Sequence, residues 1–230
     1  MSNKKILAII PARGGSKRIP RKNIKFFLGR PIISYSIEAA INSMLFDEVM
    51  VSTDDKDIAA IAIKYGAKVP FLRSKENSGD YSTTSAVIEE VLNEYEKRSM
   101  RFDIFCCVYP TAPLIKKEIF IKCFNLLVNE GFDSVFPVVK FSYPIQRSLK
   151  MIGPKVEMIY PENIYKRSQD FSAFYHDSGQ FYWMWTDKFI KNKKVFVKNS
   201  GAVVVSDLFV QDIDNLDDWK IAELKYKYFH

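Results

Sequence analysis

The fold is decided by residues 6–23, which read ILAIIPARGGSKRIPRKN. The first five of them form a short, continuous apolar run, which is typical of a central parallel strand buried on both faces. A loop rich in glycine and basic residues follows directly, and Pro31 then opens a helical pattern of apolar residues. This order of strand, loop and helix predicts an α/β domain that binds its ligand at the carboxyl end of the first strand.

The rest of the chain repeats this alternation. Further apolar runs predict strands near residues 49–51, 104–109 and 134–139, with helical patterns between them. These spacings require right-handed βαβ crossovers and therefore a mostly parallel sheet. We expect a single domain over residues 1–230, because this length supports one sizeable core.

One segment breaks the pattern. Residues 141–187 are rich in proline, tyrosine and phenylalanine and show no clear helical periodicity. We interpret them as an insertion, a small β-rich arm used in dimerisation and in closing the site. After it the chain resumes with a strand at residues 203–205 and a C-terminal helix expected over residues 216–228.

The composition is that of an ordered domain. The chain is 47% hydrophobic and 14% aromatic, which argues against disorder. No apolar run approaches the roughly 18 residues needed to span a membrane, and Pro11 and Arg13 interrupt the first run too early for a signal peptide. Cys106, Cys107 and Cys123 make an odd number without metal-binding spacing. We expect reduced core cysteines, a cytoplasmic location and no membrane association.

The positive charge is concentrated near the start of the chain. The net charge is +7, and residues 1–37 carry nine lysines and arginines but no acid. In the rest of the chain, acids slightly outnumber basic residues. A localised cluster suits a small polyanion such as a triphosphate better than a long phosphate backbone, so we do not expect a nucleic-acid partner.

The loop at residues 11–23 carries the strongest chemical signal. Gly14 and Gly15 allow the backbone to approach a ligand closely and to turn its N–H groups inward as an anion-binding nest. The loop matches neither the Walker A pattern nor the dinucleotide pattern GxGxxG. We predict a triphosphate site, with a basic surface loop or a nucleic-acid patch as the alternative. The cations of the loop are Arg13, Lys17, Arg18, Arg21 and Lys22.

A pair of carboxylates near the C-terminus suits a metal ion. Asp212 and Asp214 lie two residues apart on an extended segment, so their side chains point the same way and can share one hard cation such as Mg²⁺. An EF-hand is excluded, because Leu216 and Asp217 occupy positions where a ligand and a glycine are needed. The alternative is an acid cluster that favours a helix N-terminus.

These motifs resemble a known family. Residues 11–23 resemble the N-terminal signature of the CMP-sialic acid synthetase family, and the likeness extends to residues 51–54, 109–114 and 212–214. The resemblance implies a Rossmann-like fold of the nucleotide-diphosphosugar transferase type. It also implies an enzyme that joins CMP from CTP to a nine-carbon 2-keto-3-deoxy acid sugar, with Mg²⁺ as cofactor. A homodimer is the expected assembly.

The resemblance assigns roles to residues of the loop. Arg13, Ser16 and Lys22 would hold the triphosphate, with Lys22 nearest the α-phosphate. Asn23 would meet the cytosine or the ribose. The full set expected to bind CTP is Arg13, Gly14, Gly15, Ser16, Lys17, Lys22, Asn23, Arg73, Asp80 and Thr84.

A second polar segment is expected to recognise the base. Cytosine offers two acceptors and one donor, so Arg73 and backbone carbonyls could distinguish it, and Thr84 matches a hydroxyl residue of the family. The alternative is an ordinary polar loop that ends in a helix cap at Ser82.

Residues 167–183 resemble one branch of this family more than the other. Together with Tyr109 they resemble the pseudaminic acid branch, because the N-acetylneuraminic acid branch usually has Gln in place of Tyr109 and Asn-Gly in place of Ser178-Gly179. The residues expected to contact the sugar are Tyr109, Arg167, Gln169, His176, Gln180 and Tyr182. A role in bacterial surface or flagellar glycosylation follows from this branch.

The reaction implied is an in-line displacement in which the anomeric 2-hydroxyl of the sugar attacks the α-phosphorus of CTP and pyrophosphate leaves. Catalysis would rest on positioning and charge neutralisation by Lys22, Arg13 and the metal-binding pair Asp212 and Asp214. Other enzymes of the fold are possible if the sugar is N-acetylneuraminic, legionaminic or 3-deoxy-manno-octulosonic acid. A more distant alternative is a nucleotide- or RNA-binding module without chemistry, although paired carboxylates beside an anion site argue against it.

Overall fold

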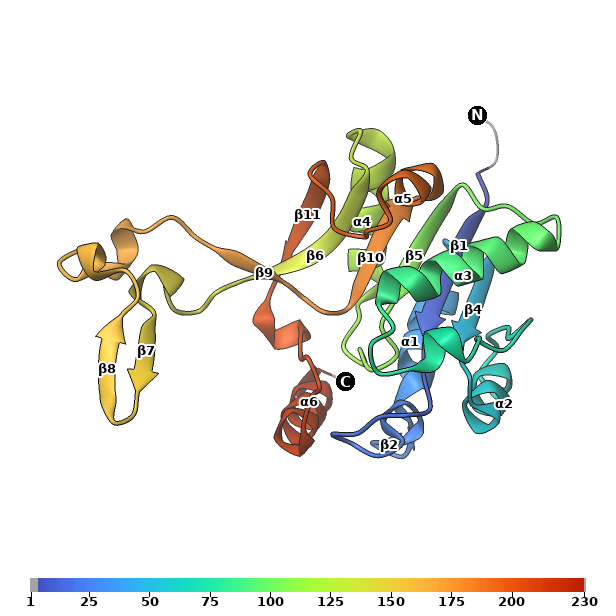
Figure 1. The fold of residues 1–230 in the computed structure, drawn as a ribbon, viewed down its shortest axis with the longest axis horizontal. Coiled ribbons are helices and arrows are strands. Elements are labelled where there is room, and N and C mark those ends of the chain that lie inside the picture. The colour runs from blue at the N-terminus through green and yellow to red at the C-terminus, as the bar shows by residue number, and fades with distance from the viewer. Residues whose placement is uncertain (1–3, 230) are drawn as a thin grey trace.

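A computed structural model describes residues 4–229 of the chain, and within this range it contains a seven-stranded sheet flanked by helices (Figure 1). The strand order is β11-β6-β10-β5-β1-β4, and β9 pairs with β6 beside this path. β1 runs parallel to β4 and β5, β11 runs parallel to β6, and β10 is antiparallel to both of its neighbours. The predicted α/β fold with a mostly parallel sheet is therefore confirmed. The strands of this sheet are β1 (Ile6–Pro11), β4 (Glu48–Ser52), β5 (Ile104–Val108), β6 (Ser134–Lys140), β9 (Tyr175–Asp177), β10 (Phe181–Trp185) and β11 (Ser200–Val205).

Helices cover both faces of the sheet. The bounds of the helices are α1 (Ile32–Ser43), α2 (Lys56–Lys64), α3 (Thr84–Lys97), α4 (Lys117–Asn129), α5 (Thr186–Asn192) and α6 (Leu216–Phe229). The last of them, α6, packs instead against the start of α1 and the loop after β1. The remaining elements are the short pairs β2 (Phe26–Phe27) with β3 (Arg30–Pro31) and β7 (Leu149–Ile152) with β8 (Lys155–Met158), and 3-10 turns at Lys22–Ile24, Glu76–Ser78, Ile145–Arg147, Pro161–Asn163, Ser168–Asp170 and Asp207–Phe209.

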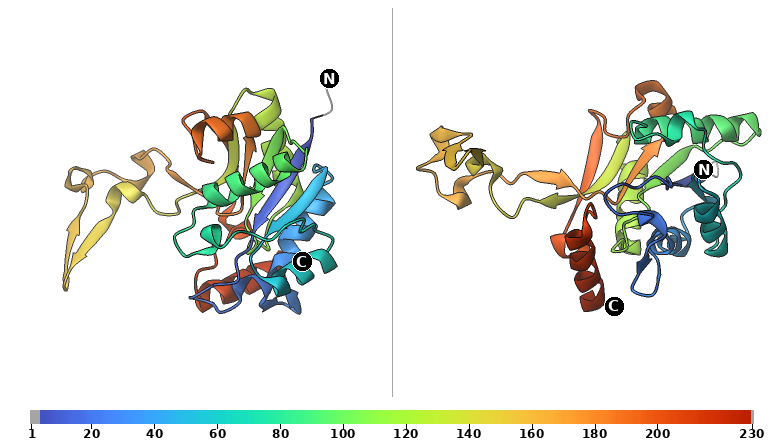
Figure 2. Two further views of the ribbon diagram at one scale, coloured as in Figure 1. Left: turned by 45° about the vertical axis from the view of Figure 1, so that its right-hand side comes forward. Right: turned by 60° about the horizontal axis from the view of Figure 1, so that its bottom comes forward.

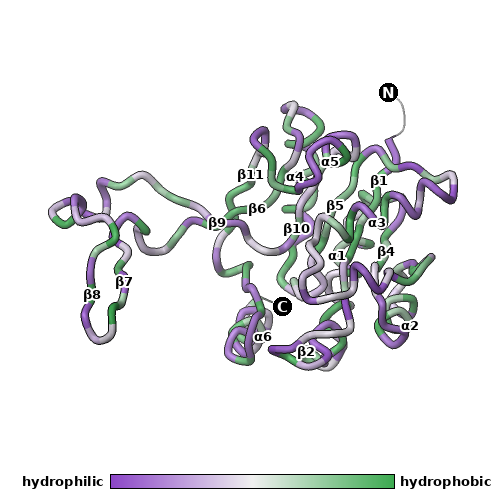
Figure 3. The backbone as a smooth tube through the Cα atoms, in the orientation of Figure 1, coloured by the Kyte–Doolittle hydropathy of each residue, from purple (hydrophilic) through white to green (hydrophobic). Residues whose placement is uncertain are grey.

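β1 shows why the opening run of apolar residues forms a central strand. Ala8 and Ile10 belong to the core beneath α1, α2 and α4, whereas Leu7 and Ile9 belong to the core beneath α3 and α5. Because successive side chains of a strand point to opposite faces, a strand buried on both sides must be apolar throughout. Figure 3 shows hydrophobic residues concentrated along the central strands. All three cysteines are buried and free, as expected.

Side chains cap α2 and α3, and the cap of α3 lies one residue later than predicted. Asp55 caps α2 by accepting hydrogen bonds from the N–H groups of Asp57 and Ile58. Thr83, not Ser82, caps α3 by accepting from the N–H of Ala86. Among the described residues, no helix combines the length and the apolar character needed to cross a bilayer.

The segment between β6 and β9 forms an arm that projects away from the sheet in every view (Figures 1 and 2). This arm, residues 141–174, carries the β7–β8 hairpin at its end. The predicted insertion at 141–187 is thus shorter in the structure, because β9 and β10 belong to the main sheet and α5 packs on it. The hairpin side chains Leu149, Met151, Ile152 and Val156 are each more than half exposed. The arm does not bury its own apolar residues.

Candidate active site

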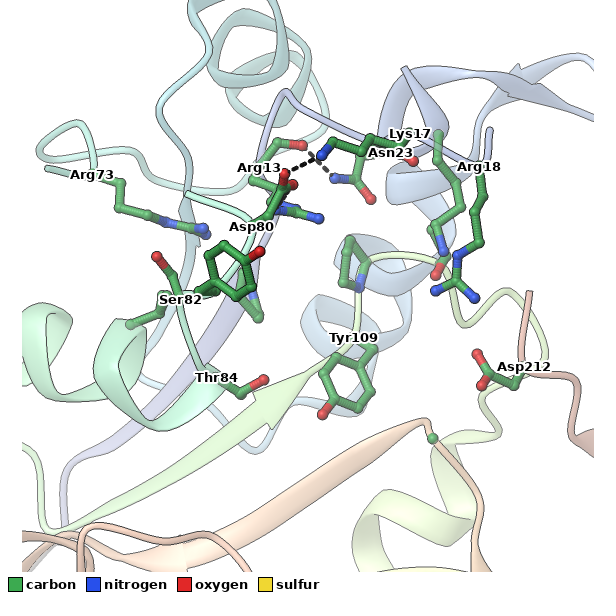
Figure 4. A pocket seen from close by; sticks show the side chains of 18 of the residues that line it. Arg13, Lys17, Arg18, Asn23, Arg73, Asp80, Ser82, Thr84, Tyr109 and Asp212 are labelled. Carbon is green, nitrogen blue, oxygen red and sulfur yellow. Dashed lines mark hydrogen bonds and ion pairs between the residues drawn. The ribbon is translucent and has the colours of Figure 1, made fainter. Parts of the chain in front are cut away.

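A cavity of about 750 Å³ opens beside the carboxyl ends of β1 and β5 (Figure 4). The loop after β1, the segment before α3, the turn after β5 and Asp212 form its walls. Ligands of open α/β sheets bind at this edge. Of the residues predicted from the sequence, the structure brings to this cavity Arg13, Ser16, Lys17, Lys22, Asn23, Arg73, Asp80, Thr84, Tyr109, Tyr182 and Asp212.

The loop after β1 is tied to the first turn of α2. The N–H of Gly14 donates to Asp54 Oδ1 at 3.0 Å, and the Arg21 guanidinium pairs with Asp55 at 2.6 Å and with Asp57 at 2.8 Å. The nest predicted at Gly14 and Gly15 is not what these residues form, because the Gly14 N–H is bonded to Asp54 and neither glycine lines the cavity. A glycine is needed at position 14 because the backbone there lies close to Asp55.

Gly14→Ala should disturb this contact. A methyl group at Gly14 would lie 2.8 Å from Asp55 Oδ2, so the carboxylate that caps α2 and binds Arg21 must shift. We expect the free energy of unfolding to fall by about 1 kcal/mol, as when an N-cap is weakened. The KM for the triphosphate expected from the sequence should rise, because the loop that carries the cations of the site is displaced. Urea unfolding and steady-state kinetics measure the two effects.

Gly15→Ala is the matched control. A Cβ at Gly15 would have no atom within 4 Å, so this variant should stay within about 0.5 kcal/mol of the parent protein and keep its KM. Equal behaviour of the two variants would show that the contact between Gly14 and Asp55 does not matter.

Lys22 joins the loop to the segment that carries the paired aspartates. Its Nζ donates to the carbonyl of Ile213 at 2.6 Å. Burial lowers the pKa of Lys22, and the charges of Asp214 and Asp212 oppose this shift. Residues about 190 positions apart in the chain therefore meet beside the cavity.

Asp212 and Asp214 are the two carboxylates that the sequence predicted to share one hard divalent cation. Burial raises the pKa of Asp212, and the charge of Asp214 raises it further, whereas the charge of Lys22 opposes the shift. Asp212 lines the cavity, whereas Asp214 does not line it and pairs with Arg18 at 2.7 Å. Residues 4–229 contain no group of three or more His, Cys, Asp or Glu side chains arranged to hold a metal. A Mg²⁺ ion here would take two carboxylates, with water and phosphate oxygens completing its shell.

Arg73 is anchored from behind. Its side chain is only 8% exposed, and Nε donates to Ser52 Oγ at 3.0 Å while Nη2 donates to the Ser52 carbonyl. Burial lowers the pKa of Arg73, and the charges of Asp54 and Glu90 oppose this shift. The guanidinium reaches toward the segment with Asp80 and Ser82 (Figure 4). It is a fixed cation at the end of the cavity away from Asp212.

Two tyrosines form the wall next to β5 and β10. The rings of Tyr109 and Tyr182 meet edge to face with centroids 6.1 Å apart. Burial raises the pKa of Tyr109 to about 12, and burial together with the charge of Asp177 raises the pKa of Tyr182 as well. Both phenols are therefore protonated at neutral pH and can donate a hydrogen bond to a ligand.

Four of the residues expected to contact the sugar lie outside the cavity. Gln180 is buried and donates to the carbonyl of Phe209 at 2.7 Å, and the His176 ring packs against Phe141 at 4.9 Å. Arg167 pairs with Asp170 at 3.0 Å on the arm, near Gln169. None of the four lines the cavity of its own chain within the described residues.

Sequence reasoning missed several residues of the cavity wall. Pro110 and Thr111 directly follow β5, so the rule that ligands bind at carboxyl ends of strands could have identified them. Asp177 also lines the cavity. It lies on β9, and the sequence did not predict that β9 pairs with β6.

Comparisons with known proteins agree with this geometry. Residues 7–214 match the family model described as Cytidylyltransferase. The chain belongs to the cytidylyltransferase family. The resemblance noted in the sequence is thereby confirmed.

Individual relatives cover the chain from end to end. It is 42% identical to the pseudaminic acid cytidylyltransferase of Campylobacter jejuni subsp. jejuni serotype O:2, over 98% of both chains. It is 32% identical to the CMP-N,N'-diacetyllegionaminic acid synthase of Legionella pneumophila, over 95% of both chains. A CMP:2-keto-3-deoxy-manno-octonic acid synthetase solved with CTP shares the fold, with a TM-score of 0.73 at 16% identity over 98% of this chain and all of that one.

Proposed function

We propose that this cytidylyltransferase transfers CMP from CTP to pseudaminic acid and releases pyrophosphate. The observation that carries the proposal is the 42% identity to a pseudaminic acid cytidylyltransferase over 98% of both chains. The cavity supports this proposal, because one part of its wall is basic and suits a polyanion, whereas another part is aromatic and suits a sugar. The cations of the loop suit the triphosphate, and the two tyrosines suit a sugar that carries acetamido groups and a terminal methyl group.

The sugar hydroxyl attacks the α-phosphorus between these two walls. Lys22 stabilises negative charge on the transferring oxygens, and Arg13 holds the triphosphate. Asp212 orients the 2-hydroxyl or accepts its proton. A covalent intermediate on cysteine is disfavoured, because all three cysteines are buried and their pKa values are raised by burial.

Asp212 and Asp214 are the residues proposed to hold Mg²⁺. When bound, the ion neutralises charge on the phosphate oxygens. The charges of both carboxylates act on Lys22, and Arg18 pairs with Asp214, so these two cations partly neutralise the carboxylates.

The test is pyrophosphate release from CTP and Mg²⁺ with a panel of nine-carbon sugars. Pseudaminic acid should be the fastest acceptor, and N-acetylneuraminic acid should lag in a competition assay read by mass. UTP should be at least about tenfold poorer than CTP, because a buried donor left unpaired costs about 1–3 kcal/mol. Transfer to N-acetylneuraminic acid at an equal rate would refute the choice of sugar but not the choice of enzyme. Stabilisation by RNA without turnover would refute both.

Legionaminic acid is the second candidate sugar. The similarity to a CMP-N,N'-diacetyllegionaminic acid synthase supports it at the lower identity of 32%. Both sugars carry two amides, so the competition assay must include them together.

We also propose a homodimer in which the arm of one chain completes the sugar site of the other. Arg167 and Gln169 lie on the arm and outside the cavity of their own chain, and the arm leaves apolar side chains exposed. Mixing Lys22→Ala with Arg167→Ala protein should then restore activity, because one site of a mixed dimer receives both native residues. Mixtures that stay inactive, although mass measurements show mixed dimers, would place Arg167 in its own chain's site or outside any site.

A further inference from the structure

One carboxylate, that of Asp80, binds two cations of the loop after β1. Asp80 Oδ1 accepts a hydrogen bond from Arg13 Nη1 at 2.9 Å, and Asp80 Oδ2 forms an ion pair with Lys17. The Gly79 carbonyl also accepts from Arg13, at 3.2 Å. Figure 4 shows Asp80 between the side chains of the loop.

The charge of Asp80 does not suit a triphosphate ligand. A phosphate oxygen and a carboxylate oxygen carry the same sign and seek the same N–H donors. Arg13 and Lys17 belong to the loop that faces the cavity, and they are the groups a triphosphate would engage. Asp80 and the triphosphate therefore compete for these two cations.

The surroundings allow Asp80 to withdraw. Its side chain is 38% exposed and that of Lys17 is 78% exposed, so both can return to water at small cost. Tyr81, the next residue, is almost fully exposed. The segment is fixed further along, where Thr83 caps α3. A short stretch around Asp80 can thus move without disturbing the helix.

We propose that Asp80 is an internal competitor for the triphosphate subsite. It keeps Arg13 and Lys17 in position while the site holds no nucleotide, gives them up to CTP, and takes them back as pyrophosphate leaves. The proposal rests on the proposed function, since it assumes that CTP is the ligand. It also changes the role first expected of Asp80, from a group that binds CTP to one that weakens the binding of CTP and of pyrophosphate.

Asp80→Asn in the full-length protein tests the competition. Asparagine keeps the shape and removes the charge, so CTP and pyrophosphate should each bind about three- to tenfold more tightly, the scale of one or two exposed ion pairs. Titration calorimetry with each ligand, in the presence of Mg²⁺ and without sugar, measures the dissociation constants. The gain in affinity should become smaller as salt is added, because salt screens the charges involved.

Glu76→Gln is the matched control. Glu76 lies in the same segment, and within residues 4–229 it forms no ion pair with the loop after β1, so the same change of charge should leave both constants unaltered. Weaker or unchanged binding in Asp80→Asn would overturn the proposal, as would an equal gain in Glu76→Gln. An unmodified protein that binds CTP but transfers CMP to no sugar would refute the proposed function and leave this comparison valid. A protein that binds neither ligand would refute both.

Discussion

Replacing Asp212 by asparagine should lower kcat by about a thousandfold, because a bound metal ion contributes several kcal/mol to stabilising the charge of the transition state. Asparagine keeps the size of the side chain but removes the charge that the ion needs. Asp212 faces the open cavity and not the hydrophobic core, so the free energy of unfolding should change by no more than about 0.5 kcal/mol. Steady-state kinetics at saturating CTP across a Mg²⁺ titration measure the effect.

Asp217→Asn provides the control for Asp212. Asp217 lies in the first turn of α6 and its side chain is 85% exposed, away from the cavity, so its loss of charge should leave kcat unchanged.

Asp214→Asn should also lose turnover, and it should release Arg18 from its ion pair. Near-normal turnover of both Asp212→Asn and Asp214→Asn at limiting Mg²⁺ would remove the metal site from this pair.

The elements predicted best are those whose form depends on neighbouring residues. The apolar run at residues 6–10 required a strand buried on both faces, and β1 has cores on both sides. The basic loop after it reaches the cavity because a parallel strand delivers its carboxyl end there. In both cases the physical cause lies within about 15 residues. The cation site predicted for Asp212 and Asp214 from their spacing stays a prediction, because Asp212 lines the cavity whereas Asp214 pairs with Arg18.

Contacts between distant parts of the chain could not be predicted in this way. Gly14 looked like part of an anion nest, but its N–H meets Asp54, 40 residues away. Gln180 looked like a sugar contact, but its amide is held by Phe209. The end of the insertion was misplaced because an aromatic-rich run serves equally well as a buried strand or as an exposed arm. The pairing of β10 with both β5 and β6 shows that the end of this run is a strand of the main sheet.

Lys22→Ala should reduce kcat by about 10²–10³, the usual loss when one fixed donor to the transition state is removed. Lys22 is the cation that joins the loop to the paired aspartates through the carbonyl of Ile213. The KM for CTP should change less than kcat, because charge on the transferring oxygens grows only in the transition state. Arg13→Ala should show the opposite split, with a higher KM and a smaller loss of kcat, because Arg13 grips the ground-state triphosphate.

Lys22→Arg separates a role of charge from a role of shape. Burial lowers the pKa of Lys22, so the parent enzyme should lose kcat as the pH rises through that lowered pKa and Lys22 gives up its proton. Arginine stays protonated throughout this range, so the alkaline fall in kcat should be absent in Lys22→Arg even if its kcat at neutral pH is reduced. An alkaline fall that persists in Lys22→Arg would assign the titration to another group. An unchanged kcat in Lys22→Ala would move the stabilising charge to a different residue of the loop.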